Sequence, residues 1–196
     1  MIDALGRGEQ VILIRKGGIA DPKFGVEAER FYLYPTFFHQ QQSEPADVTI
    51  THWCEVVRNW RVNDLETLYH LESLVVMSRE TLETRYRFRP DQALHVIGVR
   101  TFALQHPQTI RVKPEYLGCK SWVSVDDEIE VDGSLPALTE TELETRLNRV
   151  QALLASAIIT KTAIAPPATI MKVTAASSIG CRLSVVGYRL AVARDN

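Results

Sequence analysis

The order in which strand patterns and helix patterns follow one another along this chain limits the folds open to it. Five segments have the β-branched and aromatic content of strands, and they centre near residues 11, 31, 50, 96 and 121. Helix patterns occur near 64–87 and 140–160. Because strands and helices do not alternate one by one, a doubly wound fold is disfavoured. We predict an α+β fold with a mixed or antiparallel sheet.

Prolines, glycines and periodicity set the expected limits of the strands. The five strands are expected at 10–14, 30–36, 48–62, 93–104 and 119–125, and 109–112 is a further short strand candidate. For 48–62, a helix is the rival interpretation. Pro107 separates the strand at 93–104 from the one at 109–112. The last segment alternates in period two, which is typical of a half-buried strand, and Asp132 with Gly133 indicates a turn after it.

Short polar residues that can cap helices precede the first helix patterns. Asn63 or Asp64 can cap a helix by accepting from the N–H groups of its first turn. One face of that pattern is apolar, at Leu65, Leu68, Leu71 and Leu74 or Val75. Ser78 can cap a second helix that reaches Arg87 before Pro90.

A capping box announces the last helix. Thr139 and Glu142 have the spacing at which a hydroxyl and a carboxylate each accept from the other residue's backbone N–H. An apolar face follows at Leu143, Leu147, Val150 and Leu154. We predict a helix from about residue 140 to about residue 162, because the prolines at 166 and 167 forbid continuation.

Composition bounds the class of protein. The chain has 196 residues, of which 45% are apolar and 23% charged, close to globular averages. No apolar run approaches the roughly 18 to 20 residues that span a bilayer, and the first residues lack the layout of a secretory signal. We predict a cytoplasmic protein with no membrane partner, formed by one domain over 1–165 and a C-terminal extension over 166–196.

The charges are divided unevenly along the chain. Residues 157–196 hold five cations and one acid, Asp195, so this part has a net charge of +4 and the first 156 residues carry −6 of the total of −2. That balance excludes an overall basic nucleic-acid binder but permits a local basic groove.

Three phrases of the sequence resemble a known family. They are Ile-Arg-Lys-Gly-Gly-Ile at 14–19, Phe-Tyr-Leu-Tyr-Pro-Thr at 31–36 leading to His39 and Gln40, and Gly-Cys-Lys-Ser-Trp-Val at 118–123. The chain is thereby similar, over about residues 2–154, to the bacterial family known as domain of unknown function 1802. The resemblance implies no particular activity, and it leaves the tail after about Ala163 outside the family pattern.

Strand ends carry the candidate ligand-binding residues. Arg15 and Lys16 precede two glycines whose amides can help to hold a phosphate; a solvated turn with two surface cations is the alternative. Lys120 and Trp122 share one face of the expected strand and suit a nucleobase or a phosphorylated ligand; the alternative is an exposed lysine above a core-edge tryptophan. Arg100, Arg111, Lys113 and Lys120 would extend a basic face there.

The segment after the second expected strand holds the candidate general base. Tyr34, Thr36, His39 and Gln40 gather four kinds of polar group within seven residues. His39 can act as a general base or as a phosphate donor, with Glu27 or Glu29 as its carboxylate in a catalytic site. A hydrogen-bonded structural histidine is the alternative.

Metal and thiol chemistry have little support. The histidines are scattered, at 39, 52, 70, 95 and 106, so we predict no metal site. Glu27 and Glu29 with Asp126 or Asp127 give a weaker hypothesis of a hard-metal site. The cysteines, at 54, 119 and 181, are expected to be free thiols, and Lys120 makes Cys119 the one candidate for reactivity.

Three functional hypotheses remain. The first is a binding module for a nucleic acid or a phosphorylated small molecule, with ligand-binding residues Arg15, Lys16, Tyr34, Thr36, His39, Gln40, Lys120 and Trp122. The second is a hydrolase or phosphodiesterase that uses His39 with a carboxylate. The third is a structural or interaction protein. No cofactor is indicated.

Overall fold

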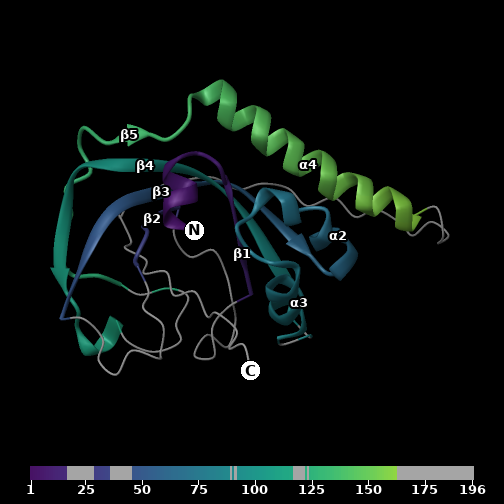
Figure 1. Cartoon of the computed structure of the whole chain (residues 1–196), viewed down its shortest axis with the longest axis horizontal. Helices are drawn as coiled ribbons and strands as arrows, with labels where there is room; N and C mark the ends of the chain where they lie inside the picture. Colours follow the sequence, from purple (N-terminus) through teal and green to yellow (C-terminus); the bar gives the residue numbers. More distant parts are fainter. Residues whose placement is uncertain are drawn as a thin grey trace, which may run out of the picture.

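A long antiparallel pair of strands forms the centre of the computed structural model, which describes residues 1–16, 29–35, 46–88, 90, 92–116, 122 and 124–162 (Figure 1). The pair is β3 (Asp47–Val62) and β4 (Leu94–Arg111). β1 (Ile12–Arg15) lies against β4 and β2 (Arg30–Tyr32) against β3, which gives the order β1-β4-β3-β2. Every pairing is antiparallel, so the predicted α+β class is confirmed.

Two features of the strands differ from prediction. The segments 93–104 and 109–112 form a single strand that runs through Pro107, because this proline lies where the register shifts between Ala103, opposite His52, and Gln108, opposite Ile50. A missing N–H is tolerated at such an irregularity. For 48–62 the strand was the correct choice and the helix was wrong.

The expected fifth strand at 119–125 is wrong for the residues that the structure describes there. Trp122, Ser124 and Val125 lie outside any strand. Instead, β5 (Leu135–Pro136) pairs with β4 opposite Phe102 and Ala103. The alternation at 119–125 did not predict a strand pairing for these described residues; Trp122 instead packs edge to face on Phe31.

The predicted caps are present at the three helices for which they were proposed. The Asp64 side chain caps α2 (Leu65–Tyr69), and Ser78 caps α3 (Arg79–Arg87). The apolar face expected from Leu65 to Val75 is not one helix, because α2 ends at Tyr69 and a 3-10 turn, η1 (Glu72–Leu74), follows.

The capping box begins α4 (Glu140–Thr162) as predicted. The backbone N–H of Thr139 donates to the Glu142 carboxylate at 2.9 Å, and the N–H of Glu142 donates to the Thr139 hydroxyl at 3.4 Å. The Thr139 hydroxyl also donates to the Glu142 carboxylate at 2.6 Å. This bond, followed by the one from the Thr139 backbone N–H, lowers the pKa of Glu142. The four predicted apolar residues of α4 are all buried, and each contributes roughly 1.5 to 3 kcal/mol.

The sheet has two differently covered faces near β1 and β4. On the helical face, Ile12, Ile14 and Val96 join a core with residues of α2, α3 and α4; Figure 1 shows α4 lying beside α2. On the opposite face, which we call the α1 face, Leu13 and Ile97 pack with Leu5 of α1 (Ile2–Gly6). Adjacent residues of β1 and β4 therefore point into different environments.

The remaining described elements are small. A 3-10 turn, η2 (Pro114–Tyr116), follows β4, and Gly133 has a positive φ of 72° in the predicted turn. None of the helices in the described ranges has the length and apolar character needed to cross a membrane. The extension proposed for 166–196 lies outside the described residues, so the domain boundary stays a prediction.

Candidate cation-lined binding site

Arg15 and Lys16 are buried and do not form the solvated turn considered above. Their exposed fractions are 4% and 3%. The Lys16 ammonium donates to the backbone carbonyl of Tyr86 in α3 and lies 4.9 Å from the centre of the Tyr86 ring. Lys16 therefore fastens the end of β1 to a helix on the helical face. Arg15, one residue earlier, has the alternate direction and belongs to the α1 face.

Arg15 is the first member of a row of basic residues that crosses three strands. Its direct partner on β4 is His95, and the partner of His95 on β3 is Arg61. We call Arg15, His95 and Arg61 the cationic row. Directly paired residues point to the same side of a sheet with their Cβ atoms about 5 Å apart. The row thus places two arginines on either side of one histidine.

Hydrogen bonding and charge define the state of His95. Its Nδ1 lies 3.1 Å from the Asn59 side-chain oxygen, and because that oxygen only accepts, Nδ1 donates. Burial lowers the pKa of His95, and the positive charge of Arg61 lowers it further. Arg61 is exposed and forms no ion pair with a carboxylate among the described residues. Burial and the Arg61 charge therefore both favour the neutral form of His95.

A second row lies on the helical face, and its arginines form ion pairs with glutamates. Arg30, Glu55 and Arg100 are direct partners across β2, β3 and β4. Arg30 and Arg100 lie 2.7 and 3.7 Å from the Glu55 carboxylate, and Arg100 also contacts Glu140 at the start of α4. We call these four residues the alternating row. Its charges neutralise one another within the protein.

Two other predicted site residues belong to the core. Tyr34 is buried in a cluster with Tyr32 and Trp53. Trp122 packs edge to face on Phe31, with ring centres 5.4 Å apart, beside the apolar cluster of the α1 face. Trp122 therefore matches the alternative of a core-edge tryptophan and shares a face with Arg15.

Several predicted residues cannot be compared with the structure. Thr36, His39, Gln40, Lys120 and Glu27 lie outside the described residues. Glu29 is exposed, and its backbone carbonyl accepts from the Val56 N–H at 2.8 Å. The predicted convergence of Arg15 or Lys16 with His39 and Lys120 therefore stays a prediction.

The basic face proposed around 94–123 is largely neutralised where the structure describes it. Arg100 belongs to the alternating row, and Lys113 lies 3.2 and 3.7 Å from Asp126 and Asp127. The hydrogen bond to Asp126 is the main reason that the pKa of Lys113 is raised. The two aspartates therefore pair with a lysine, and the described residues contain no group of three potential metal ligands.

Cys54, the cysteine within the described residues, is buried. Burial raises the pKa of its thiol to about 12, although a hydrogen bond to Thr101 opposes the shift. A thiol with this pKa is protonated at neutral pH and unreactive.

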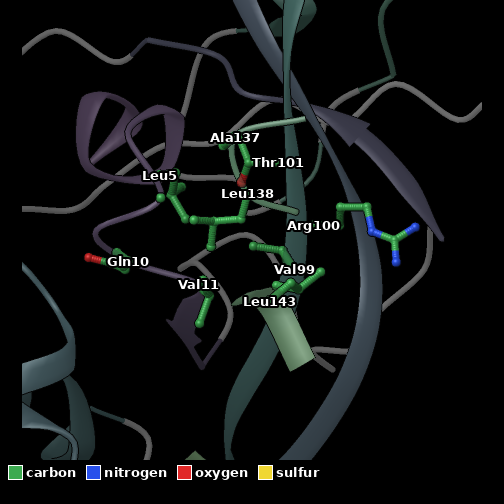
Figure 2. Close-up of a pocket in the computed structure, with 10 residues that line it drawn as sticks. Leu5, Gln10, Val11, Val99, Arg100, Thr101, Ala137, Leu138 and Leu143 are labelled. Atoms are coloured by element: carbon green, nitrogen blue, oxygen red, sulfur yellow. The ribbon is translucent and has the colours of Figure 1, made fainter. Parts of the chain in front are cut away.

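A small pocket lies at the edge of β4, between β1 and the segment after β5 (Figure 2). Its volume is about 10 Å³ and its lining includes Leu5, Val11, Val99 and Leu143. Figure 2 shows the Arg100 guanidinium directed away from these apolar side chains. The pocket holds about one water molecule and is too small for a ligand.

Sequence reasoning identified Arg15 but missed Arg61 and His95. Each is an ordinary polar residue in its own strand, and only the register between β1, β4 and β3 brings them together. The alternation of polar and apolar residues around His95 was the one available signal. It predicts the face of the sheet on which His95 lies, but not which residues of the neighbouring strands lie beside it.

The fold and the site define a class of protein: an α+β domain with α2, α3 and α4 on one face of an antiparallel sheet and a row of basic residues on the α1 face. The chain belongs to the family described as Domain of unknown function (DUF1802), whose model matches residues 1–149. This confirms the resemblance found in the sequence. Neither the curated proteins nor the solved structures contain a match to the chain.

Proposed function

We propose that this protein is a binding module for a small phosphate-bearing ligand, which it holds at the cationic row. The observation that carries the proposal is the placement of two arginines as cross-strand neighbours of one histidine. Arg61 is exposed and forms no ion pair with a carboxylate among the described residues, so an anion bound there would supply its counter-charge.

The dimensions of the row suit one phosphate group. Neighbouring strands are about 4.8 Å apart, so the backbones of Arg15 and Arg61 are separated by about 10 Å. Arginine side chains are long enough to reach inward from both sides, and each guanidinium offers a planar fork to phosphate oxygens. His95 lies between them on β4.

Charge and burial favour a small ligand over a nucleic acid. The first 156 residues carry a net charge of −6, which repels a polyanion at long range. Arg15 is 4% exposed, so it suits a discrete site better than a surface that tracks a phosphate backbone. A nucleic acid is therefore the alternative outcome of the test.

The hydrolase alternative receives less support. A general base is usually oriented by a second group, often a carboxylate, whereas the described partner of His95 is the amide of Asn59. His39 with Glu27 or Glu29 stays an untested alternative, because two of these three residues lie outside the described ranges.

Calorimetry with inorganic phosphate, a nucleoside monophosphate and a single-stranded oligonucleotide tests the proposal. Arg61→Gln should weaken phosphate binding about tenfold or more, since a hydrogen bond to a charged group contributes about 1.5 to 3 kcal/mol. Arg100→Gln is the matched control from the alternating row and should leave the affinity unchanged. Added salt should weaken binding.

Equal phosphate affinity in wild type and Arg61→Gln would refute the site. If the oligonucleotide bound and the two small ligands did not, the proposed ligand would be a nucleic acid and not a small phosphate-bearing molecule.

A further inference from the structure

We infer that α1 is a proton-gated cover of the α1 face: it docks on the sheet while His52 is neutral and is released when His52 takes up a proton. The inference does not depend on the proposed anion site, because it concerns a different part of the same face. It stands on the way in which α1 lies against the His52 ring and against the apolar cluster beside that ring.

α1 covers apolar side chains of the sheet. Leu5 of α1 is fully buried, and it packs in one cluster with residues of three strands, among them Leu13, Cys54, Ile97 and Val99. α1 has only five residues, so a local opening of this helix costs less free energy than unfolding of the whole domain. Release of α1 would therefore expose apolar surface while the strands stay paired.

Gly6, the last residue of α1, lies directly against the imidazole of His52. A Cβ atom added to Gly6 would overlap His52 Nε2, so the close approach of the helix to the ring requires a glycine. His52 and Cys54 are two residues apart in β3, opposite Ala103 and Thr101 of β4, and they therefore share one face of the sheet. The ring thus lies at the border of the cluster that α1 covers.

The groups around His52 suit its neutral form. Nδ1 lies 2.8 Å from the Thr51 hydroxyl, whereas Nε2 forms no hydrogen bond with a described residue. A protonated ring carries an N–H on both nitrogens, so the second donor would be held against the Gly6 backbone without a described acceptor. Moving α1 away lets water reach this donor, which removes the cost of leaving it unsatisfied.

The charges that act on His52 come from α1 alone among the described residues. Burial lowers the pKa of His52, and Asp3 of α1 opposes this shift with the smaller effect. The cross-strand partner Ala103 and the preceding Thr51 carry no charge. Burial beneath α1 therefore outweighs the attraction of Asp3 for the proton.

Linkage fixes the sign of the effect. The pKa of His52 is lowered in the docked state, and it returns toward the ordinary histidine value of about 6.5 when α1 leaves. The released state thus binds the proton more tightly. Release is therefore favoured as the pH falls below about 6.5, by at most about tenfold per pH unit.

Hydrogen exchange measured by NMR on the full chain tests the inference. The amides of Leu5 and Gln10 donate to backbone carbonyls of Met1 and Ala4, so they report on α1. After correction for intrinsic exchange, both should exchange several times faster at about pH 5.5 than at about pH 7.5. The amide of Val99, which bonds β4 to the Val11 carbonyl, reports opening of the sheet and should show no such change.

Three substitutions assign the proton. His52→Gln should remove the pH dependence of exchange in α1, whatever its effect on the rate at one pH. His95→Gln is the matched control, because the pKa of His95 is also lowered by burial, and it should keep the dependence. Asp3→Asn removes the charge that favours the proton in the docked state, so the dependence should become steeper.

The results distinguish a gated helix from ordinary acid unfolding. Exchange of α1 that does not depend on pH, a pH dependence that persists in His52→Gln, or equal acceleration of Leu5 and Val99 would overturn the inference. Each of these results leaves the anion site untouched, because phosphate titration measures that site separately.

Discussion

The two charged rows of the sheet each place one side chain between two arginines, but that central side chain is a carboxylate in one row and an imidazole in the other. In the alternating row, Glu55 lies between two arginines and is within 3.7 Å of both. In the cationic row, a histidine occupies the corresponding central position between Arg15 and Arg61. The central residue thus decides whether the two arginines of a row share a carboxylate or lie on either side of an imidazole.

The two rows are also expected to differ in their roles, one in the stability of the fold and the other in ligand binding. The alternating row joins β2, β3, β4 and α4, so breaking it should cost folding free energy. Arg61, at the exposed end of the cationic row, forms no ion pair with a described carboxylate, so removing it should cost affinity instead. The predictions below test this division in order of expected effect.

The largest effect is expected from Leu147→Asp, which removes the support of the alternating row. Leu147 is fully buried on α4, beside Gly98, and α4 holds Glu140 against Arg100. A buried carboxylate in place of a leucine should cost several kcal/mol, roughly 3 to 5, and unfold the domain. Thermal melting measures the loss.

Ala152→Asp is the control, because it adds the same charge on the exposed side of α4, and it should melt close to wild type. Equal losses of stability in the two variants would refute the packing of α4.

The start of α4 and its buried face could be predicted from the sequence because both depend on residues that are close together along the chain. A capping box and an apolar stripe lie within one helix, so periodicity and hydrogen-bond chemistry suffice to predict them. Asp64 and Ser78 were predicted for the same reason.

The candidate site was less predictable because it depends on contacts that are distant in sequence. Lys16 docks on Tyr86, 70 residues later. His95 meets Arg15 and Arg61 only through strand register, which a one-residue slip would undo.

A moderate effect is expected from Glu55→Gln at the centre of the alternating row. The substitution leaves Arg30 and Arg100 without their shared carboxylate, and we expect a loss of about 1 kcal/mol, because these groups are only partly buried. Arg61→Gln should change the free energy of unfolding by less than about 0.5 kcal/mol. Denaturant unfolding compares the two, and a larger loss in Arg61→Gln would reverse the proposed division.

A smaller effect is expected from pH. Because the pKa of His95 is lowered in the folded protein, the unfolded chain binds the proton more readily, and stability falls as the pH drops below about 6.5. Arg61→Gln should reduce this fall, since it removes the charge that lowers the pKa further. Unfolding at about pH 7.5 and about pH 5.5 measures the slope; a steeper slope in Arg61→Gln would contradict the account.

The smallest effect is expected from truncation after Ala165. The tail has a weak pattern and lies beyond the family match to residues 1–149, so the shortened chain should melt within a few degrees of the full chain. A large loss of cooperativity would place the tail in the core.

NMR observation of arginine and histidine side chains during titration with sulfate tests the central claim most directly. We predict that the side-chain signals of His95 and Arg61 shift together and saturate at one affinity, while those of Arg30 and Arg100 stay in place. Shifts confined to the alternating row, or no saturable shift in the cationic row, would contradict the assignment of the anion site.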